Sequence, residues 1–120
     1  MQQKKHEKVG TNMFLYHITP TENVPSIKRN GLVPQIGPRA TLIGEPEKAV
    51  YFFYSIKEVD NALLNWLGEE FGEDEELSLI TVYLTDEFIS KNEVQAAGYE
   101  YAISAVINPE HITGIEPYLD

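Results

Sequence analysis

Polar residues inside otherwise apolar segments are the positions of this sequence best placed to do chemistry. His17, Tyr51 and Glu100 each stand in such a segment. An imidazole or a carboxylate can hydrogen-bond a ligand, and a phenol ring can stack on a flat one. Each residue also has a structural interpretation: a core histidine bonded to backbone, a core tyrosine with a satisfied hydroxyl, and a glutamate that faces water by strand alternation. The residues alone leave both interpretations open.

Other familiar chemistries lack their residues. The histidines at 6, 17 and 111 fall in three different segments without the spacing of a zinc site, so no metal site is expected. The glycines are too far apart for a Walker or Rossmann phosphate loop. The chain has no cysteine, which excludes a thiol nucleophile and disulfides and favours a reducing, cytoplasmic location.

The elements that would position the three residues follow from hydrophobic periodicity. Apolar, β-rich runs predict strands, and apolar residues at helical spacing predict a helix over 56–71 with Trp66 as a core anchor. The expected strands span 13–18, 49–54, 77–84, 99–107 and 113–116, with one short helical turn at 86–90. The few helices and the strand-rich C-terminal half predict an α+β fold with a mainly antiparallel sheet.

The first helix has two candidate starts. Thr19 and Glu22 have the spacing of a capping box, and Asn23 offers a rival cap with Pro25 in the first turn. With either start the helix ends at Asn30-Gly31, a sequence typical of a left-handed stop. A long irregular loop is expected over 32–48.

Composition and charge bound the class of protein. The 120 residues suit one domain, which we place at 13–120 after a frayed tail at 1–12. No apolar run approaches the roughly 20 residues of a membrane span, so no membrane association is expected. The formal net charge of −10 makes a nucleic-acid partner less expected. Six acids lie in the eight residues 69–76, either as a solvated loop or as a docking site for a basic partner.

Three stretches together resemble the ADP-ribosyltransferase superfamily. Residues 15–19 and 23–34 resemble its opening Tyr-His-x-Thr strand and the helix that ends in Gly-Leu. Residues 50–53 resemble the aromatic second strand. Residues 99–103 and 107–112 resemble the glutamate-bearing strand and the Pro-Glu turn that follows. The resemblance covers most of the chain and implies an ADP-ribosyltransferase-like split β-sheet core with two main helices.

The resemblance to the His-Tyr-Glu branch also implies roles, with NAD as the substrate. His17 would bond the adenosine ribose with support from Thr19, and Tyr51 would stack on the nicotinamide. Glu100 would be the catalytic residue, binding the nicotinamide ribose and stabilising its positive charge as nicotinamide leaves. Arg39 is the candidate for the pyrophosphate, with a solvated loop residue as the alternative.

The leading hypothesis is a toxin-like or phage-related enzyme that transfers ADP-ribose from NAD to a protein or small target. The opening also resembles DarT toxins and RNA 2′-phosphotransferases, but it lacks the arginine that precedes the phosphotransferase histidine. The alternative is a binding module that kept the fold and lost catalysis. The enzyme requires His17, Tyr51 and Glu100 to face one crevice, whereas a Glu100 that points away from His17 favours the module.

Overall fold

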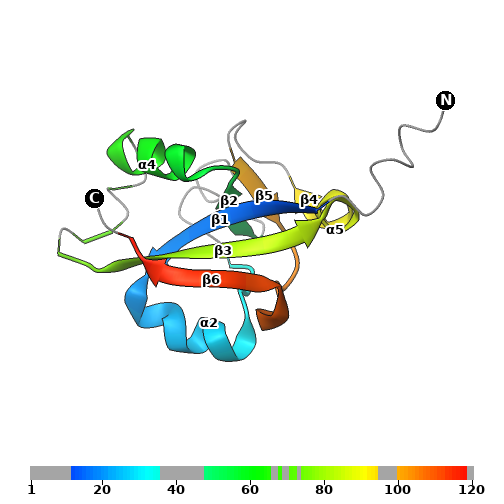
Figure 1. The fold of residues 1–120 in the computed structure, drawn as a ribbon, viewed down its shortest axis with the longest axis horizontal. Helices are drawn as coiled ribbons and strands as arrows, with labels where there is room; N and C mark the ends of the chain where they lie inside the picture. The colour runs from blue at the N-terminus through cyan, green and yellow to red at the C-terminus, as the bar shows by residue number, and fades with distance from the viewer. Residues whose placement is uncertain are drawn as a thin grey trace.

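A computed structural model describes residues 12–35, 48–65, 68, 71–72, 74–94 and 100–118. These residues form an α+β fold with a six-stranded sheet and three α-helices (Figure 1). In chain order the elements are β1 Asn12–Pro20, η1 Thr21–Asn23, α2 Val24–Asn30, β2 Val50–Phe53, α4 Ile56–Asn65, β3 Leu77–Thr85, α5 Asp86–Asn92, β4 Glu93–Val94, β5 Glu100–Ile103, η3 Pro109–His111 and β6 Ile112–Pro117.

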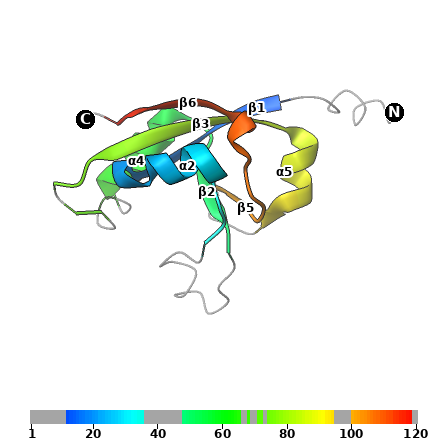
Figure 2. The ribbon, with the colours of Figure 1, turned by 90° about the horizontal axis from the view of Figure 1, so that it is seen from below.

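The sheet is antiparallel throughout, with the strand order β4-β5-β2-β1-β3-β6. β1 pairs with β3 along its whole length, from Asn12 opposite Thr85 to Pro20 opposite Leu77. Between β1 and β2 the register contains only Tyr16 opposite Phe53. We call this place the seam. It joins two three-stranded halves, and Figure 2 shows β2 and β5 running steeply away from β1, β3 and β6.

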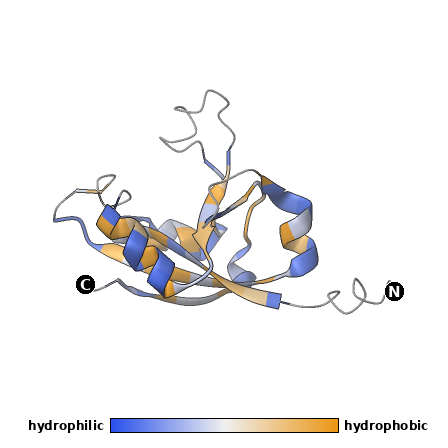
Figure 3. Cartoon of the chain, turned by 90° about the horizontal axis from the view of Figure 1, so that it is seen from above, coloured by the Kyte–Doolittle hydropathy of each residue, from blue (hydrophilic) through white to orange (hydrophobic). Residues whose placement is uncertain are grey.

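Each face of the sheet carries its own apolar core, because side chains alternate along a strand. Figure 1 shows α2 and α4 on opposite faces of the sheet. Leu15, Phe52 and Ile80 belong to the core on the α2 face, and Ile18 and Phe53 to the core on the α4 face. Figure 3 shows the corresponding pattern, with largely hydrophobic strands and with α4 divided between hydrophobic and hydrophilic residues.

α2 begins at the later of its two candidate starts. Asn23 is its N-cap residue, with Pro25 in the first turn, although no side chain caps the helix. The Thr19–Glu22 capping box is wrong, because Thr19 remains in β1 and its hydroxyl accepts from Asn23 Nδ2 at 3.0 Å. The predicted stop at Gly31 is confirmed by its φ of 81°. A Cβ there would lie 2.0 Å from the Ile107 carbonyl oxygen, so only glycine fits.

The helical turn expected at 86–90 is confirmed as α5, whereas β4 was not predicted. α5 extends two residues further than expected, to Asn92, and Thr85 Oγ1 caps it by accepting from Phe88 N at 3.0 Å. β4 then pairs with β5 at the edge of the sheet.

Several predicted boundaries need correction. Asn12, assigned to the tail, is the first residue of β1. The strand predicted at 99–107 is only β5, because the Ser104 amide bonds Asn92 O and Ile107 forms an isolated bridge with Leu32. α4 buries Val59 and Ala62, with Ile56 exposed. Trp66 lies outside the described residues. Among the helices of the described part, none has the length and apolar character needed to cross a bilayer.

Candidate functional site at the seam of the sheet

The three strands that carry the candidate residues are neighbours. His17 is on β1, Tyr51 on β2 and Glu100 on β5, and these strands are consecutive in the order β5-β2-β1. The seam separates His17 from the other two. Beyond Tyr16 and Phe53 the register between β1 and β2 does not continue, so backbone groups of β2 are left for other partners.

His17 bridges the seam with its side chain. Its Nδ1 lies 2.8 Å from the carbonyl oxygen of Tyr51, and its ring lies 5.8 Å from that of Phe52, centroid to centroid. Burial lowers the pKa of His17 below its usual 6.5, and the bond to the Tyr51 carbonyl opposes this shift in part. The imidazole is therefore neutral near pH 7.

The hydrogen bond fixes the tautomer of His17. A carbonyl oxygen only accepts, so Nδ1 carries the proton of the neutral ring and Nε2 carries a lone pair. No buried side-chain nitrogen or oxygen of the described residues lacks a partner, and Nε2 bonds none of them. Nε2 is thus reached by solvent. It is an acceptor that a ligand hydroxyl can approach.

Thr19 has a local structural role. The residue is 5% exposed, and its hydroxyl accepts from Asn23 Nδ2 at the start of α2. It lies two residues beyond His17 on the same face of β1. Thr19 therefore fixes the turn from β1 into α2 and does not contact His17 through a side-chain bond.

Tyr51 and Glu100 share the other face. Glu100 pairs with Phe53, and Tyr51 pairs with Ala102 one step along the same two strands. Directly paired residues of antiparallel strands point to one face, so Tyr51 and Glu100 lie diagonally adjacent there. Phe53 belongs to the core under α4, which identifies this as the α4 face. Glu100 is 7% exposed, an unusual burial for a carboxylate.

The expectation that all three residues face one side of the sheet is wrong for His17. Leu15, two residues before His17 on the same face of β1, belongs to the core of the α2 face. Phe52, whose ring contacts the His17 ring, belongs to the same core. Alternation within β1 and β2 thus turns the His17 ring away from Tyr51 and Glu100. The interpretation of Glu100 as a water-facing residue is also wrong, because the residue is buried. Arg39 lies outside the described residues.

A cavity in the described part of the chain lies elsewhere. It has a volume of about 1100 Å³ and lies between α4 and the ends of β3 and β6. None of the four candidate residues that the structure describes, His17, Thr19, Tyr51 and Glu100, lines it. The sequence did not predict this site. The one clue is Leu64, an apolar residue at a position of the predicted helix that does not face the core, and in the structure it is 83% exposed.

No group of three metal-ligating side chains occurs among the residues that the structure describes. The chain matches no protein-family model and no curated protein sequence. What the site can do must therefore be argued from its own geometry.

Proposed function

We propose that this chain is an ADP-ribosyltransferase-like domain that binds NAD beside the Tyr51–Glu100 pair and uses Glu100 to promote loss of nicotinamide, although His17 does not share their face as the sequence-based requirement demands. The observation that carries the proposal is a buried carboxylate on β5 diagonally beside a tyrosine on β2. The division of the sheet into two halves agrees with the split core that the sequence resemblance implies.

The chemistry suits a carboxylate held in a partly dry site. When the bond from nicotinamide to ribose breaks, positive charge develops on the sugar, and an ionised Glu100 would stabilise that charge. The ring of Tyr51 would hold the nicotinamide by stacking on it. The ADP-ribose would then pass to a nucleophile on a protein or small target, or to water.

His17 would serve the other end of the dinucleotide. Because β1 and β2 remain paired at Tyr16 and Phe53, a ligand that reached both His17 and the Tyr51–Glu100 pair would have to pass around the strands and not between them. The Nε2 lone pair of His17 would accept from a hydroxyl of the adenosine ribose.

A second candidate is a binding module without catalysis. The orientation of His17 favours it, since the ring lies on the opposite face from Glu100 and already bonds the Tyr51 carbonyl. Thr19 likewise has a structural partner in Asn23.

Two measurements separate these candidates. Millimolar NAD should raise the melting temperature by several degrees if the chain binds it, because ligand at a hundred times Kd adds about 2.7 kcal/mol. Release of nicotinamide then reports catalysis, and Glu100→Gln should slow it by about a hundredfold or more. Glu58→Gln, on α4 and outside the pair, is the matched control. An absent melting shift overturns the NAD-dependent enzyme and leaves the binding module, and a shift without nicotinamide release leaves a module that binds NAD without cleaving it.

A further inference from the structure

The groove between α4 and the ends of β3 and β6 has a floor and walls of apolar side chains. We call it the α4–β6 groove. Its apolar lining includes Val24, Leu63, Leu64, Phe71, Leu77 and Ile115. Phe71 and Leu63 pack against the core of the α4 face, so the groove is continuous with that core. At about 1100 Å³ it lies at the upper end of the range of ligand pockets, large enough for a short peptide.

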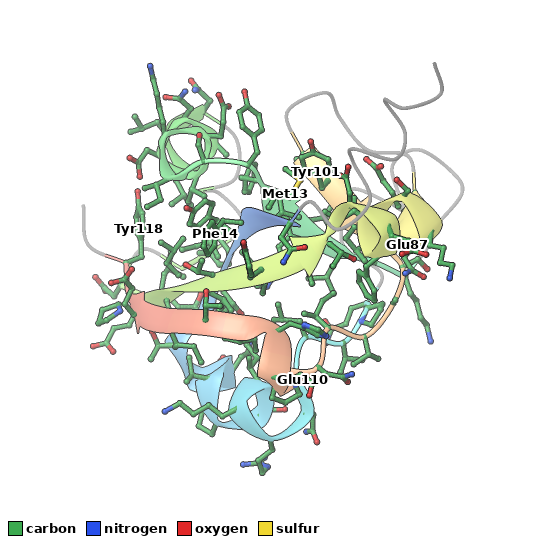
Figure 4. All side chains as sticks on the ribbon, turned by 45° about the vertical axis from the view of Figure 1, so that its right-hand side comes forward. Met13, Phe14, Glu87, Tyr101, Glu110 and Tyr118 are labelled. Atoms are coloured by element: carbon green, nitrogen blue, oxygen red, sulfur yellow. The ribbon has the colours of Figure 1, made fainter. Side chains whose placement is uncertain are left out.

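One end of the groove is fixed by a side-chain bond. Tyr118, which follows β6, donates its hydroxyl proton to Asp60 Oδ1 of α4 at 2.5 Å, and its amide bonds Leu77 O. Figure 4 shows Tyr118 extending toward α4. The two walls are therefore held together before any partner binds, which lowers the ordering cost of binding.

Leu64 is a large apolar side chain that no other described residue covers substantially. It is the most exposed large apolar residue of the described chain, at 83%, and it stands on the groove side of α4. Burying a leucine side chain contributes roughly 1.5–3 kcal/mol, so a partner that covered it would gain appreciably.

The charges around this apolar lining have one sign. The groove is lined by Asp60, Glu75, Glu76 and Glu116, and no lysine, arginine or histidine is among the described residues that line it. The chain as a whole carries a formal charge of −10. An anionic partner would be repelled, which excludes nucleic acid and anionic lipid as the favoured occupants.

We propose that the α4–β6 groove binds a short basic segment of another protein, in which apolar anchors are flanked by lysines or arginines. The anchors would cover Leu64 and Phe71, and the flanking cations would meet Glu75, Glu76 and Glu116. Glu75 and Glu76, the last two acids of the run at 69–76, would then belong to a docking site for a basic partner. This site shares no residue with the Tyr51–Glu100 pair, so it stands whether or not the chain handles NAD.

A selection from a displayed library of random peptides of about 15 residues, four helical turns long, tests the proposal on the full chain. Parallel selections use Leu64→Ala and Glu116→Lys as groove variants. Val106→Ala and Glu110→Lys, at exposed positions that do not line the groove, are the matched controls, and Figure 4 labels Glu110. We expect enriched peptides to combine apolar residues with net positive charge, and to be retained by the controls but lost by the groove variants.

Affinity measurements on an enriched peptide complete the test. Leu64→Ala and Glu116→Lys should each weaken binding by about fivefold or more, and the two controls should change it by less than twofold. Raising the salt from about 0.05 to 0.5 M should weaken it further. Acidic or uncharged consensus peptides, binding that the groove variants leave intact, or no enrichment at all would each overturn the proposal. Glu100→Gln should bind the peptide normally.

Discussion

At the scale of single residues, His17 is the most informative side chain. It stands where β1 and β2 stop pairing, and its Nδ1 donates to the Tyr51 carbonyl across the seam. The bond to the Tyr51 carbonyl fits the interpretation of His17 as a core histidine bonded to backbone. The ligand-binding interpretation then concerns Nε2 alone.

The lowered pKa of His17 makes stability depend on pH. The folded chain resists protonation, while the unfolded chain takes up a proton near pH 6.5, so this contribution is complete above 6.5 and is lost as the pH falls below it. His17→Asn keeps a donor for Tyr51 O and removes the titration. We expect the stability of wild type relative to His17→Asn, measured by urea unfolding, to decrease from about pH 7.5 to 5.5. Parallel pH profiles would contradict it.

The same substitution probes the ligand. Because His17→Asn retains the donor to the backbone but lacks the Nε2 acceptor, it should fold and yet lose part of the stabilisation by NAD. Removing one hydrogen bond to a ligand costs roughly 1 kcal/mol, or about fivefold in affinity. Calorimetric titration of both chains with NAD measures this difference, and equal affinities would remove His17 from the proposed site.

Among the elements, α5 depends on a single cap. Thr85 Oγ1 accepts from Phe88 N in the first turn, where Asp86 and Glu87 also complement the helix dipole. Thr85→Ala should lower the free energy of unfolding by about 1 kcal/mol. Ser90→Ala, at an exposed position of the same helix, should be neutral or slightly stabilising. Chemical denaturation of the two variants measures the difference. A similar loss in both would show that removing a hydroxyl, and not removing the cap, destabilises the helix.

α2 ends where glycine is required. Gly31 has a φ of 81° and ψ of −167°, a region nearly closed to other residues, and its missing Cβ admits the Ile107 carbonyl. We expect Gly31→Ala to cost at least about 2 kcal/mol. At Gly114 an added Cβ would meet only Thr81 atoms at 3.7 Å, an ordinary contact, so Gly114→Ala is the control. A thermal unfolding series measures both, and similar losses would contradict the argument.

The sequence predicts the helices and strands better than it predicts how the strands pair and which face of the sheet each side chain occupies. Continuous apolar runs gave β1, β2 and β3 nearly to the residue, and Asn30-Gly31 gave the end of α2. The extent of β5 could not be read from 99–107, because Ser104 and Ile107 bond distant partners, Asn92 and Leu32. Tertiary pairing of that kind has no local signal.

The candidate site shows the same division. The alternation within each strand follows from local pattern. The burial of Glu100 depends on its pairing with Phe53, and which face of β1 matches which face of β2 depends on the Tyr16–Phe53 register. A shift of one residue in that register would bring His17 onto the face of Tyr51. The α4–β6 groove joins residues from both ends of the described chain, so no single stretch of sequence announces it.

At the scale of the whole molecule, the two halves of the sheet differ in how many residue pairs hold their own strands together. β1 and β3 pair over nine residues each, whereas β2 and β5 pair over four. Local opening is easier where fewer contacts must break. We expect amides of β1 and β3 to exchange with deuterium more slowly than those of β2 and β5. Mass spectrometry or NMR measures this exchange, and equal protection of the amides in the two halves would show that they open together.

The seam does not divide the chain into separable domains. Strands β1, β3 and β6 form one half and β2, β4 and β5 the other, so the two halves are interleaved along the polypeptide. Because β1 is the first strand of the chain and β6 the last, a cut at any single connection would split the half formed by β1, β3 and β6. That half can therefore not be completed from either fragment of a cut chain, and complementation should need fragments that together restore all six strands. Long-range pairing of this kind also carries a kinetic consequence, since distant segments must meet before either half closes, which slows folding relative to a helical protein of this length.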